Sequence, residues 1–253
     1  MAEERIPLIE TVDLKKYFKV GDKSFLHAVD GINMKVYAGE TIGVVGESGC
    51  GKSTLGRTIL RLIEPTSGQI LYNGDDITKY NTRQMKKMRQ ELQIIFQDPY
   101  ASLDPRKSVI EIIAEYMIIN KTLPKKREIF NRAAHLMDVV GLARRYATAY
   151  PHELDGGRRQ RIGIARALSV NPKFIVCDEI VSALDVSIQA QVVSLMMKIQ
   201  EELDLTYIFI GHDLSVVRHI SDQVAVLYLG KIMELTDSDE LYRTPLHPYT
   251  QAL

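Results

Sequence analysis

Three glycines, a lysine and a serine stand at fixed spacing in one short segment of the chain. The segment Gly46-Glu-Ser-Gly-Cys-Gly-Lys-Ser53 fits the pattern G-x-x-x-x-G-K-[S/T]. It follows the apolar run Thr41–Val45 and precedes a helical pattern, which is the context that this motif requires. Glycines let successive backbone N–H groups turn toward phosphate oxygens, and the start of a helix adds positive potential. The segment therefore predicts a nucleotide phosphate site.

The residue types within this loop predict distinct roles. Lys52 is expected to reach the β- and γ-phosphates, and the Ser53 hydroxyl is expected to bind Mg²⁺. Cys50 is either a small filler or a thiol whose pKa is lowered at the start of a helix, and its alkylation is predicted to block nucleotide binding. The loop residues predicted to contact the nucleotide are Gly46, Ser48, Gly49, Cys50, Gly51, Lys52, Ser53 and Thr54.

Two carboxylates follow another apolar run, Phe174–Cys177. Asp178 fits the acid at a strand tip that holds Mg²⁺ through water in phosphate-loop proteins. Glu179 fits a residue that orients or deprotonates the attacking water. An acid pair after a strand is by itself an ordinary start of a loop. The phosphate loop upstream is what favours a functional role for this pair. Together the two segments predict nucleotide hydrolysis.

Two polar side chains follow two further apolar runs. Gln97 comes after Leu92–Phe96 and is predicted to lie near Mg²⁺ or water, the alternative being a polar turn. His212 follows Tyr207–Ile210, at the strand ends where phosphate-facing groups gather in open α/β sheets. The segment Ser182–Asp185 comes shortly after the acid pair. These positions extend the predicted site beyond the phosphate loop.

A second glycine pair, Gly156-Gly157, precedes the helical pattern Ile162–Leu168. Two glycines before a helix can form another anion-binding helix start, although the pair alone is a weak signal. Asp155 comes just before the pair, and aspartate is also a favoured residue for capping the start of a helix.

Short apolar runs alternate with longer helical patterns along most of the chain. β-Branched runs of this kind suit a sheet buried on both faces, and the alternation predicts an α/β fold with a mostly parallel sheet. Short strands at Leu8–Val12 and Ile32–Val36 predict a small antiparallel flank near the N-terminus. Between Pro99 and His152 the chain shows helical patterns without a convincing strand, which predicts an inserted helical subdomain. The predicted strands are Thr41–Val45, Leu92–Phe96, Phe174–Cys177, Tyr207–Ile210 and Val224–Tyr228, and the predicted helices are Lys52–Ile63, Val109–Asn120, Lys126–Val140, Ile162–Leu168, Ser187–Leu203 and Leu214–Ile220.

Composition excludes several classes of protein. The 32 basic and 32 acidic residues cancel, so the basic excess typical of general nucleic-acid binding is missing. No apolar run approaches the ~20 residues of a membrane span, and the polar, acidic start Met1–Arg5 is unlike a secretory signal. Two cysteines, Cys50 and Cys177, are too few for a disulfide framework or a four-cysteine zinc site.

In their order along the chain, these motifs resemble those of the ATP-binding subunits of ABC transporters. The resemblance covers nearly the whole chain, with Walker A at 46–53, the Q-loop at Gln97, the signature at 154–158, Walker B at 174–178, the D-loop at 182–185 and the switch His212. Two further runs are similar to the oligopeptide/dipeptide and nickel importers of this family. These are Phe96-Gln-Asp-Pro-Tyr-Ala-Ser-Leu-Asp-Pro-Arg106 and Leu246-His-Pro-Tyr-Thr250.

The resemblance implies a P-loop NTPase (RecA-like) fold in one ABC ATPase domain over residues 1–253. Residues 1–98 and 162–235 would form the α/β nucleotide-binding core, 99–161 the helical subdomain with the signature, and 236–253 a C-terminal segment whose tail is truncated. The implied activity is Mg²⁺-dependent ATP hydrolysis that powers peptide import. No Asn-Lys-x-Asp run is present, which favours ATP over GTP.

In this family two subunits pack head to tail, and each ATP lies between one Walker A loop and the partner's signature. By resemblance, Phe18 would stack on adenine, with Tyr17 as the alternative, and Lys52, Gln97, Glu179 and His212 would be catalytic. Mg²⁺ would be held by Ser53, Gln97 and Asp178, while Asp155, Gly156 and Gly157 would contact the other nucleotide.

The signature departs from the usual Leu-Ser-Gly-Gly-Gln, because Asp155 replaces serine and Arg158 replaces glutamine. An ionised aspartate ~4 Å from a phosphate is repelled by about 4 kcal/mol at an effective dielectric constant near 20, and Arg158 would offset part of this. We therefore expect a heterodimer with two unequal sites. Ile180 replaces the family's proline and Gly211 its serine, changes expected to alter loop stiffness and leave the chemistry intact.

The implied partners are a second, non-identical ATPase subunit, two integral-membrane permease subunits and, indirectly, an extracytoplasmic substrate-binding protein. The chain would then lie at the cytoplasmic face of the cell membrane and bind no nucleic acid. The alternatives are an ABC-type ATPase acting on nucleic acid or ribosomes, an importer ATPase for nickel, and a nucleotide-binding regulator without turnover. Intact Glu179 and His212 argue against the regulator.

Overall fold

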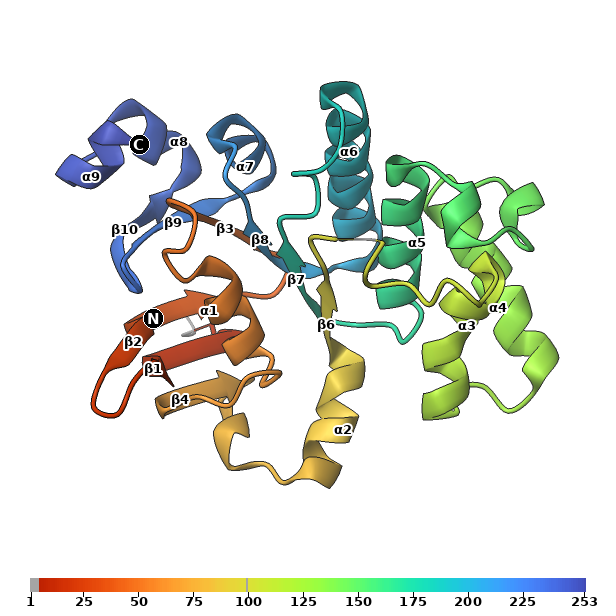
Figure 1. Cartoon of the computed structure of the whole chain (residues 1–253), viewed down its shortest axis with the longest axis horizontal. Coiled ribbons are helices and arrows are strands. Elements are labelled where there is room, and N and C mark those ends of the chain that lie inside the picture. Colours follow the sequence, from red (N-terminus) through yellow and green to blue (C-terminus); the bar gives the residue numbers. More distant parts are fainter. Residues whose placement is uncertain (1–4, 99) are drawn as a thin grey trace. The chain divides into compact units, whose positions relative to one another are not determined.

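The computed structural model describes residues 5–98 and 100–253, which form two compact units (Figure 1). The first unit contains the chain up to Arg89 together with Asp204–Leu253, and the second contains Gln90–Leu203. Most of the acidic start of the chain, and Pro99 at the predicted beginning of the helical insert, lie outside the described residues.

The first unit contains an antiparallel sheet with the strand order β2-β1-β4-β5. It includes the predicted N-terminal flank, which is confirmed, but its first two strands are longer than the sequence pattern indicated. β1 pairs with β2 from Ile9 opposite Val36 to Lys19 opposite Phe25. The strands are β1 Ile9–Lys19, β2 Phe25–Val36, β4 Ser67–Tyr72 and β5 Asp75–Asp76.

A second group of strands in the first unit is ordered β10-β9-β3-β8. β3 lies between β8 and β9 and runs parallel to both, whereas the hairpin partner β10 is antiparallel to β9. Every residue of β3 and β8 is buried, as their apolar, β-branched composition predicts. The strands are β3 Thr41–Val45, β8 Thr206–Ile210, β9 Gln223–Tyr228 and β10 Lys231–Asp237.

Short helices follow these strands and complete the first unit. α1 begins directly after the glycine loop, and α7 begins at Leu214 because Asp213 caps its first backbone N–H groups. The helices and single turns are α1 Lys52–Ile59, η1 Ile77–Lys79, α2 Thr82–Glu91, whose last two residues belong to the second unit, α7 Leu214–Ile220, α8 Ser238–Arg243 and α9 Pro248–Ala252.

The second unit joins a parallel strand pair to a helical cluster. β6 Leu92–Ile95 runs parallel to β7 Phe174–Asp178, which is buried along its whole length. In the helical cluster, α3 packs against both α4 and α5. The predicted helix Val109–Asn120 is confirmed as α3, and the Glu111 carboxylate accepts a hydrogen bond from the backbone N–H of Ser108 at its start. The helices and turns are α3 Val109–Asn120, α4 Lys126–Val139, η2 Arg144–Tyr146, η3 Pro151–Glu153, α5 Gly156–Leu168 and α6 Val186–Leu203.

Two predicted helix bounds are wrong by more than one residue, while the predicted end of α4 at Val140 and the predicted start of α6 at Ser187 each differ by one. α1 ends at Ile59 and not at Ile63. α5 begins at Gly156, six residues before the predicted start at Ile162, because the side chain of Asp155 accepts a hydrogen bond from the N–H of Arg158 and starts the helix there. The glycine pair is therefore part of the helix and not a loop before it.

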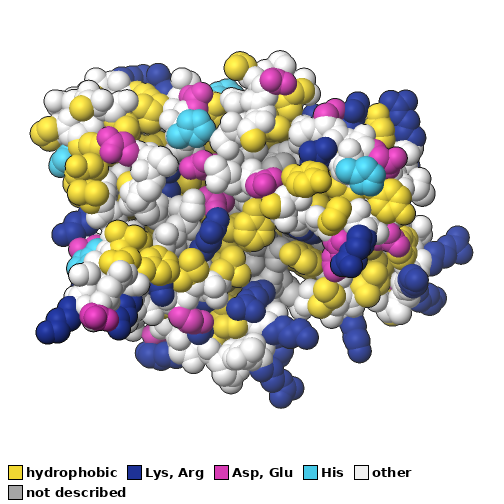
Figure 2. Space-filling model, in the orientation of Figure 1, with side chains coloured by type: hydrophobic (Ala, Val, Ile, Leu, Met, Phe, Trp, Pro, Cys, Tyr) yellow, Lys and Arg dark blue, Asp and Glu magenta, His cyan; other side chains and the backbone are white. Residues whose placement is uncertain are grey.

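On the face shown in Figure 2, basic and acidic side chains are interspersed, in line with the equal numbers of each in the sequence. No helix in the described part of the chain combines the length and the apolar character needed to cross a bilayer.

Candidate functional site

The glycine loop between β3 and α1 lies entirely in the first unit. Gly46, Gly49 and Gly51 all have positive φ angles, of 144°, 80° and 112°. A Cβ atom at position 46 would lie 2.1 Å from the Leu227 carbonyl oxygen, and one at position 51 would lie 2.0 Å from the Ala28 carbonyl oxygen. Gly46 and Gly51 are therefore required by close backbone approach, whereas Gly49 faces open space and is required only by its φ.

The Lys52 side chain folds back into this loop. It is only 4 % exposed, and its Nζ donates hydrogen bonds to the carbonyl oxygens of Gly46 at 2.8 Å and Glu47 at 2.9 Å. The first turn of α1 contains no acidic residue that would neutralise this cation or the positive end of the helix. A buried ammonium group within a curled backbone is suited to a phosphate chain. Ser48 and Gly49 are exposed at the turn, and Ser53 and Thr54 lie in the first turn of α1.

The prediction of an acidified thiol at Cys50 is wrong. The side chain is 5 % exposed, and burial raises the pKa of the thiol, with Lys52 opposing this shift only in part. The backbone N–H of Gly230 donates to the Cys50 carbonyl oxygen at 2.9 Å. Cys50 is therefore the packed filler of the loop, and its contribution to a nucleotide would come from its backbone.

This environment predicts slow alkylation of both cysteines. The Cys177 thiol is completely buried in β7, and desolvation raises its pKa as well. Because both pKa values are raised, less thiolate exists at any given pH, and we expect iodoacetamide to label neither residue of the folded chain at pH 7.5. Two thiols should react once the chain is unfolded in urea, as counted by mass spectrometry. Rapid labelling of folded Cys50 would contradict the buried environment.

The two candidate adenine-stacking residues lie side by side on β1 and point to opposite faces of the strand. The Tyr17 ring stacks on His27, with centroids 3.8 Å apart and planes 14° from parallel, and its hydroxyl donates to Asp30. The Asp30 hydrogen bond raises the pKa of Tyr17. The Lys16 ammonium lies 4.9 Å from the ring centroid of Phe18, the residue predicted to stack on adenine. Both rings are half-buried, and this does not distinguish them as adenine-stacking residues. Adenine stacking on Phe18 therefore stays a prediction.

His212 is exposed after the end of β8 in the first unit. No hydrogen bond to it is found among the described residues. The preceding Gly211 has a packing reason, because a Cβ atom there would lie 2.7 Å from a methyl group of Val217. Glycine thus replaces the expected serine where α7 approaches the backbone.

The second unit brings Gln97 and Glu179 together. The Gln97 Nε2 donates a hydrogen bond to Glu179 Oε2 at 2.7 Å. Asp178 ends β7 with no exposed surface, and the next residue, Glu179, has a φ of 50°, a conformation that costs free energy for a side chain of this kind. The chain turns sharply at the acid pair, so the buried Asp178 and the half-buried Glu179 occupy different environments.

The signature segment also lies in the second unit. Besides capping α5, Asp155 pairs with Arg158 through a carboxylate oxygen 2.6 Å from Nη1, which bears out the expectation that Arg158 offsets its charge. Cβ atoms at Gly156 and Gly157 would lie 3.2 Å from Leu184 and 2.7 Å from Ile188. The glycine pair therefore lets the start of α5 approach the D-loop and the start of α6 closely.

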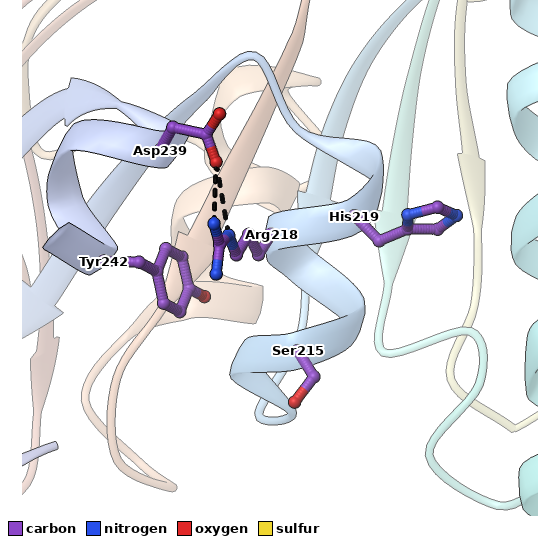
Figure 3. A pocket seen from close by; sticks show the side chains of 5 residues that line it. All are labelled: Ser215, Arg218, His219, Asp239 and Tyr242. Atoms are coloured by element: carbon purple, nitrogen blue, oxygen red, sulfur yellow. Dashed lines mark hydrogen bonds and ion pairs between the residues drawn. The ribbon is translucent and has the colours of Figure 1, made fainter.

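A pocket of about 490 Å³ in the first unit contains none of the predicted site residues (Figure 3). Its lining comes from α7 and α8, where Arg218 pairs with Asp239 at 2.9 Å and lies over the Tyr242 ring. The guanidinium charge is thus satisfied within the pocket. We assign this pocket no role in nucleotide chemistry.

The phosphate loop contacts one residue, Tyr249, that is not among the predicted site residues. The backbone N–H of Glu47 donates to the hydroxyl of Tyr249 at 3.0 Å. Tyr249 belongs to the run Leu246–Thr250, which marks the family in the sequence. No local pattern predicts this contact, because the two residues are 202 positions apart.

Comparison with known proteins places this geometry in a family. Residues 29–182, more than half of the chain, match the family described as "ABC transporter". The oligopeptide transport ATP-binding protein OppF of Bacillus subtilis (strain 168) is 53% identical over 97% of this chain and 81% of its own length. The dipeptide transport ATP-binding protein DppF of Escherichia coli (strain K12) is 48% identical over 98% of this chain and 75% of its own length.

A solved structure agrees in fold. The dimeric ATP-binding cassette MJ0796, in a post-hydrolysis state bound to ADP and Pi, superposes with a TM-score of 0.82 at 27% identity, covering 91% of this chain and 98% of that one. With the glycine loop, its buried lysine and the acid pair after β7, these matches establish that the chain belongs to the ABC transporter family of ATP-binding proteins.

Proposed function

We propose that the chain is the ATP-binding and ATP-hydrolysing subunit of an ABC importer for peptides. The observation that carries the proposal is the buried Lys52 held inside a glycine loop, in a chain about half identical to oligopeptide and dipeptide transport ATP-binding proteins. A buried cation surrounded by backbone groups gains most from a polyanionic ligand, and ATP supplies that ligand.

The site residues divide the work by chemical type. Lys52 and the N–H groups of the loop would bind the phosphates, and Phe18 would stack on adenine. Glu179 would position and activate the attacking water, and His212 would contact the terminal phosphate. Asp155 and the two glycines that follow it would serve the second nucleotide of a head-to-tail dimer.

The residues present fit Mg²⁺ delivered with the nucleotide. Among the described residues, no group of three or more His, Cys, Asp or Glu side chains is placed to hold a metal ion by itself. Mg²⁺ usually keeps several waters and is bound by one or two carboxylates together with substrate phosphates. The Ser53 hydroxyl, the Gln97 amide oxygen and the buried Asp178 carboxylate are donors of this kind, and the ion would neutralise charge that develops on the phosphates.

The unusual signature supports a non-identical ATPase partner. The Asp155 carboxylate accepts hydrogen bonds from the backbone N–H and the guanidinium of Arg158. An ionised carboxylate has no proton to donate to a γ-phosphate, whereas a serine hydroxyl has one. This chain's Walker motifs would therefore form the stronger site with an intact partner signature, and its own signature would serve a weaker one.

Replacing Asp155 with Ser tests this asymmetry. Serine preserves helix capping and supplies a donor, so we expect about tenfold faster hydrolysis at the weaker site of the assembled complex. Asp155→Gly is the matched control, because glycine is tolerated at the start of a helix and removes the charge without adding a side-chain donor. The rate is measured as phosphate release with the stronger site inactivated. An equal response to both variants would assign the effect to charge alone, and no response would contradict the asymmetry.

The assembly and the cargo are tested together. The tagged chain is recovered from its native membranes, and its partners are identified by mass spectrometry. A second ATPase with two multi-span permease proteins supports the transporter at the cytoplasmic membrane face, whereas nucleic acid or ribosomal proteins without a membrane protein would overturn it. Uptake of a labelled peptide against uptake of Ni²⁺, in cells with and without the chain, then separates the peptide importer from the nickel importer.

A further inference from the structure

One peptide group of the phosphate loop is hydrogen-bonded at both ends. In the peptide group that joins Gly46 to Glu47, the carbonyl oxygen accepts a hydrogen bond from the Lys52 ammonium at 2.8 Å. Its N–H donates to the Tyr249 hydroxyl at 3.0 Å. Tyr249 therefore acts on the opposite end of the same planar group that holds the phosphate-binding lysine. The contact lies within the first unit.

Two strands place the Tyr249 ring at this point. Glu234 on β10 accepts hydrogen bonds from the backbone N–H groups of Leu246 at 3.1 Å and His247 at 3.0 Å, which fixes the chain just before α9. The Tyr249 ring then packs on Tyr228 of β9, with centroids 4.3 Å apart and a 38° tilt. The hydroxyl is held over the loop by this packing and not only by its own hydrogen bond.

The chemistry of the phenol suits this task. Burial raises the pKa of Tyr249, so the hydroxyl stays neutral at physiological pH and accepts the Glu47 N–H without adding negative charge beside a phosphate site. The backbone at Gly46 has a φ of 144° and leaves no room for a side chain, because a Cβ atom there would lie 2.1 Å from the Leu227 carbonyl oxygen. The phenol fixes the other side of the same peptide. Together the two hydrogen bonds favour the orientation in which the Gly46 carbonyl faces Lys52.

We propose that Tyr249 is a positioning residue for the phosphate loop, which fixes the Gly46–Glu47 peptide so that Lys52 is presented to the phosphates of the nucleotide. The inference deepens the proposed function and rests on ATP binding at this loop. It also gives the segment Leu246–Thr250 a structural role at the nucleotide site, because the Tyr249 phenol oxygen on α9 accepts a hydrogen bond from the phosphate loop.

Removing that one oxygen is the direct test. Tyr249→Phe keeps the ring against Tyr228 but leaves the Glu47 N–H without its acceptor. Tyr228→Phe is the matched control, because it removes a phenol oxygen from the same ring pair, and that oxygen bonds to nothing in the described part of the chain. The probes are ATP, which contacts the whole site, and inorganic tripolyphosphate, which can contact only the phosphate-binding part.

We expect Tyr249→Phe to weaken binding of both probes by about 3- to 10-fold, the range given by losing one hydrogen bond. Tyr228→Phe should bind both as the wild-type chain does. In the assembled complex the KM for ATP should rise for Tyr249→Phe while kcat stays unchanged. Weaker ATP binding with unchanged tripolyphosphate binding would overturn the proposal, because the phenol would then act on the nucleoside.

Amide hydrogen exchange of the ATP-free chain provides an independent measurement. The Glu47 N–H should exchange faster in Tyr249→Phe than in Tyr228→Phe, without a general increase over β3 and β9. The two proposals fail differently. A wild-type chain that does not bind ATP contradicts the proposed function, whereas a wild-type chain that binds ATP no better than Tyr249→Phe contradicts the role of Tyr249 alone.

Discussion

Replacing Glu179 with Gln is expected to lower ATP turnover by about 10²- to 10⁴-fold while ATP binding is retained. The carboxylate accepts a hydrogen bond from Gln97 at 2.7 Å, and the amide oxygen of Gln in its place can accept the same bond. The substitution therefore preserves the shape of the turn and removes only the group that can take a proton from water. With ATP bound and hydrolysis blocked, the closed dimer should accumulate.

Phosphate release at saturating ATP gives the turnover, and ATP-dependent dimerisation by size-exclusion chromatography gives the closed state. The matched control is Glu201→Gln, the same change at an exposed carboxylate on α6, which should leave both unchanged. An assembled complex with Glu179→Gln that hydrolyses ATP at the wild-type rate would remove Glu179 from the catalytic step.

Replacing Gly51 with Ala is expected to destabilise the first unit by about 3 kcal/mol or more and to abolish ATP binding. The φ of 112° is unfavourable for any residue with a Cβ, and that Cβ would lie 2.0 Å from the Ala28 carbonyl oxygen. Because the Cβ position is fixed by the backbone and the carbonyl oxygen belongs to the backbone, no side-chain rotation relieves the clash. The loop must move away from β2, and Lys52 moves with it.

Gly49→Ala separates the two causes of this loss. Its φ of 80° carries a similar conformational penalty, but the added Cβ meets nothing within 4 Å. We expect a cost of about 1–2 kcal/mol for this variant. Urea unfolding followed by circular dichroism and an ATP binding assay measure both. Equal losses for the two variants would show that loop conformation, and not the approach to Ala28, decides stability here.

Elements whose pattern is strongly apolar could be predicted closely, and those with little buried surface could not. The helix Val109–Asn120 and the strand Thr41–Val45 match the structure residue for residue. α2 is missing from the prediction because it buries only Met85, so no apolar period marks it. β10 is only half-buried and lies at the edge of its sheet, which leaves its alternation weak.

The site shows the same division at the level of side chains. Spacing was enough to identify the phosphate loop and the acid pair after β7. The comparison with the family's usual signature was enough to expect Arg158 to offset the charge of Asp155, with which it pairs. Spacing was not enough to assign the state of Cys50, because a thiol at a helix start would be acidified in solvent and is instead buried by the packing around it. The choice of Phe18 over Tyr17 for adenine stacking stays a prediction, because adjacent strand residues differ only in which face of the strand they occupy.

The sequence by itself determined the chemistry of this protein, because loops that bind phosphate and residues that cap helices act through backbone groups a few positions away. A glycine loop followed by a lysine predicts phosphate binding when a strand precedes it and a helix follows it, and both can be recognised in the neighbouring sequence. The tertiary structure decided the features that depend on segments far apart along the chain lying close together in space. These are the lack of room for a side chain at Gly46 and Gly51 beside Leu227 and Ala28, the burial of Cys50, and the hydrogen bond of Tyr249 to a peptide group of the phosphate loop 202 residues away. No local sequence pattern encodes these features, because the segments involved are far apart along the chain and are brought together only by strand pairing and packing.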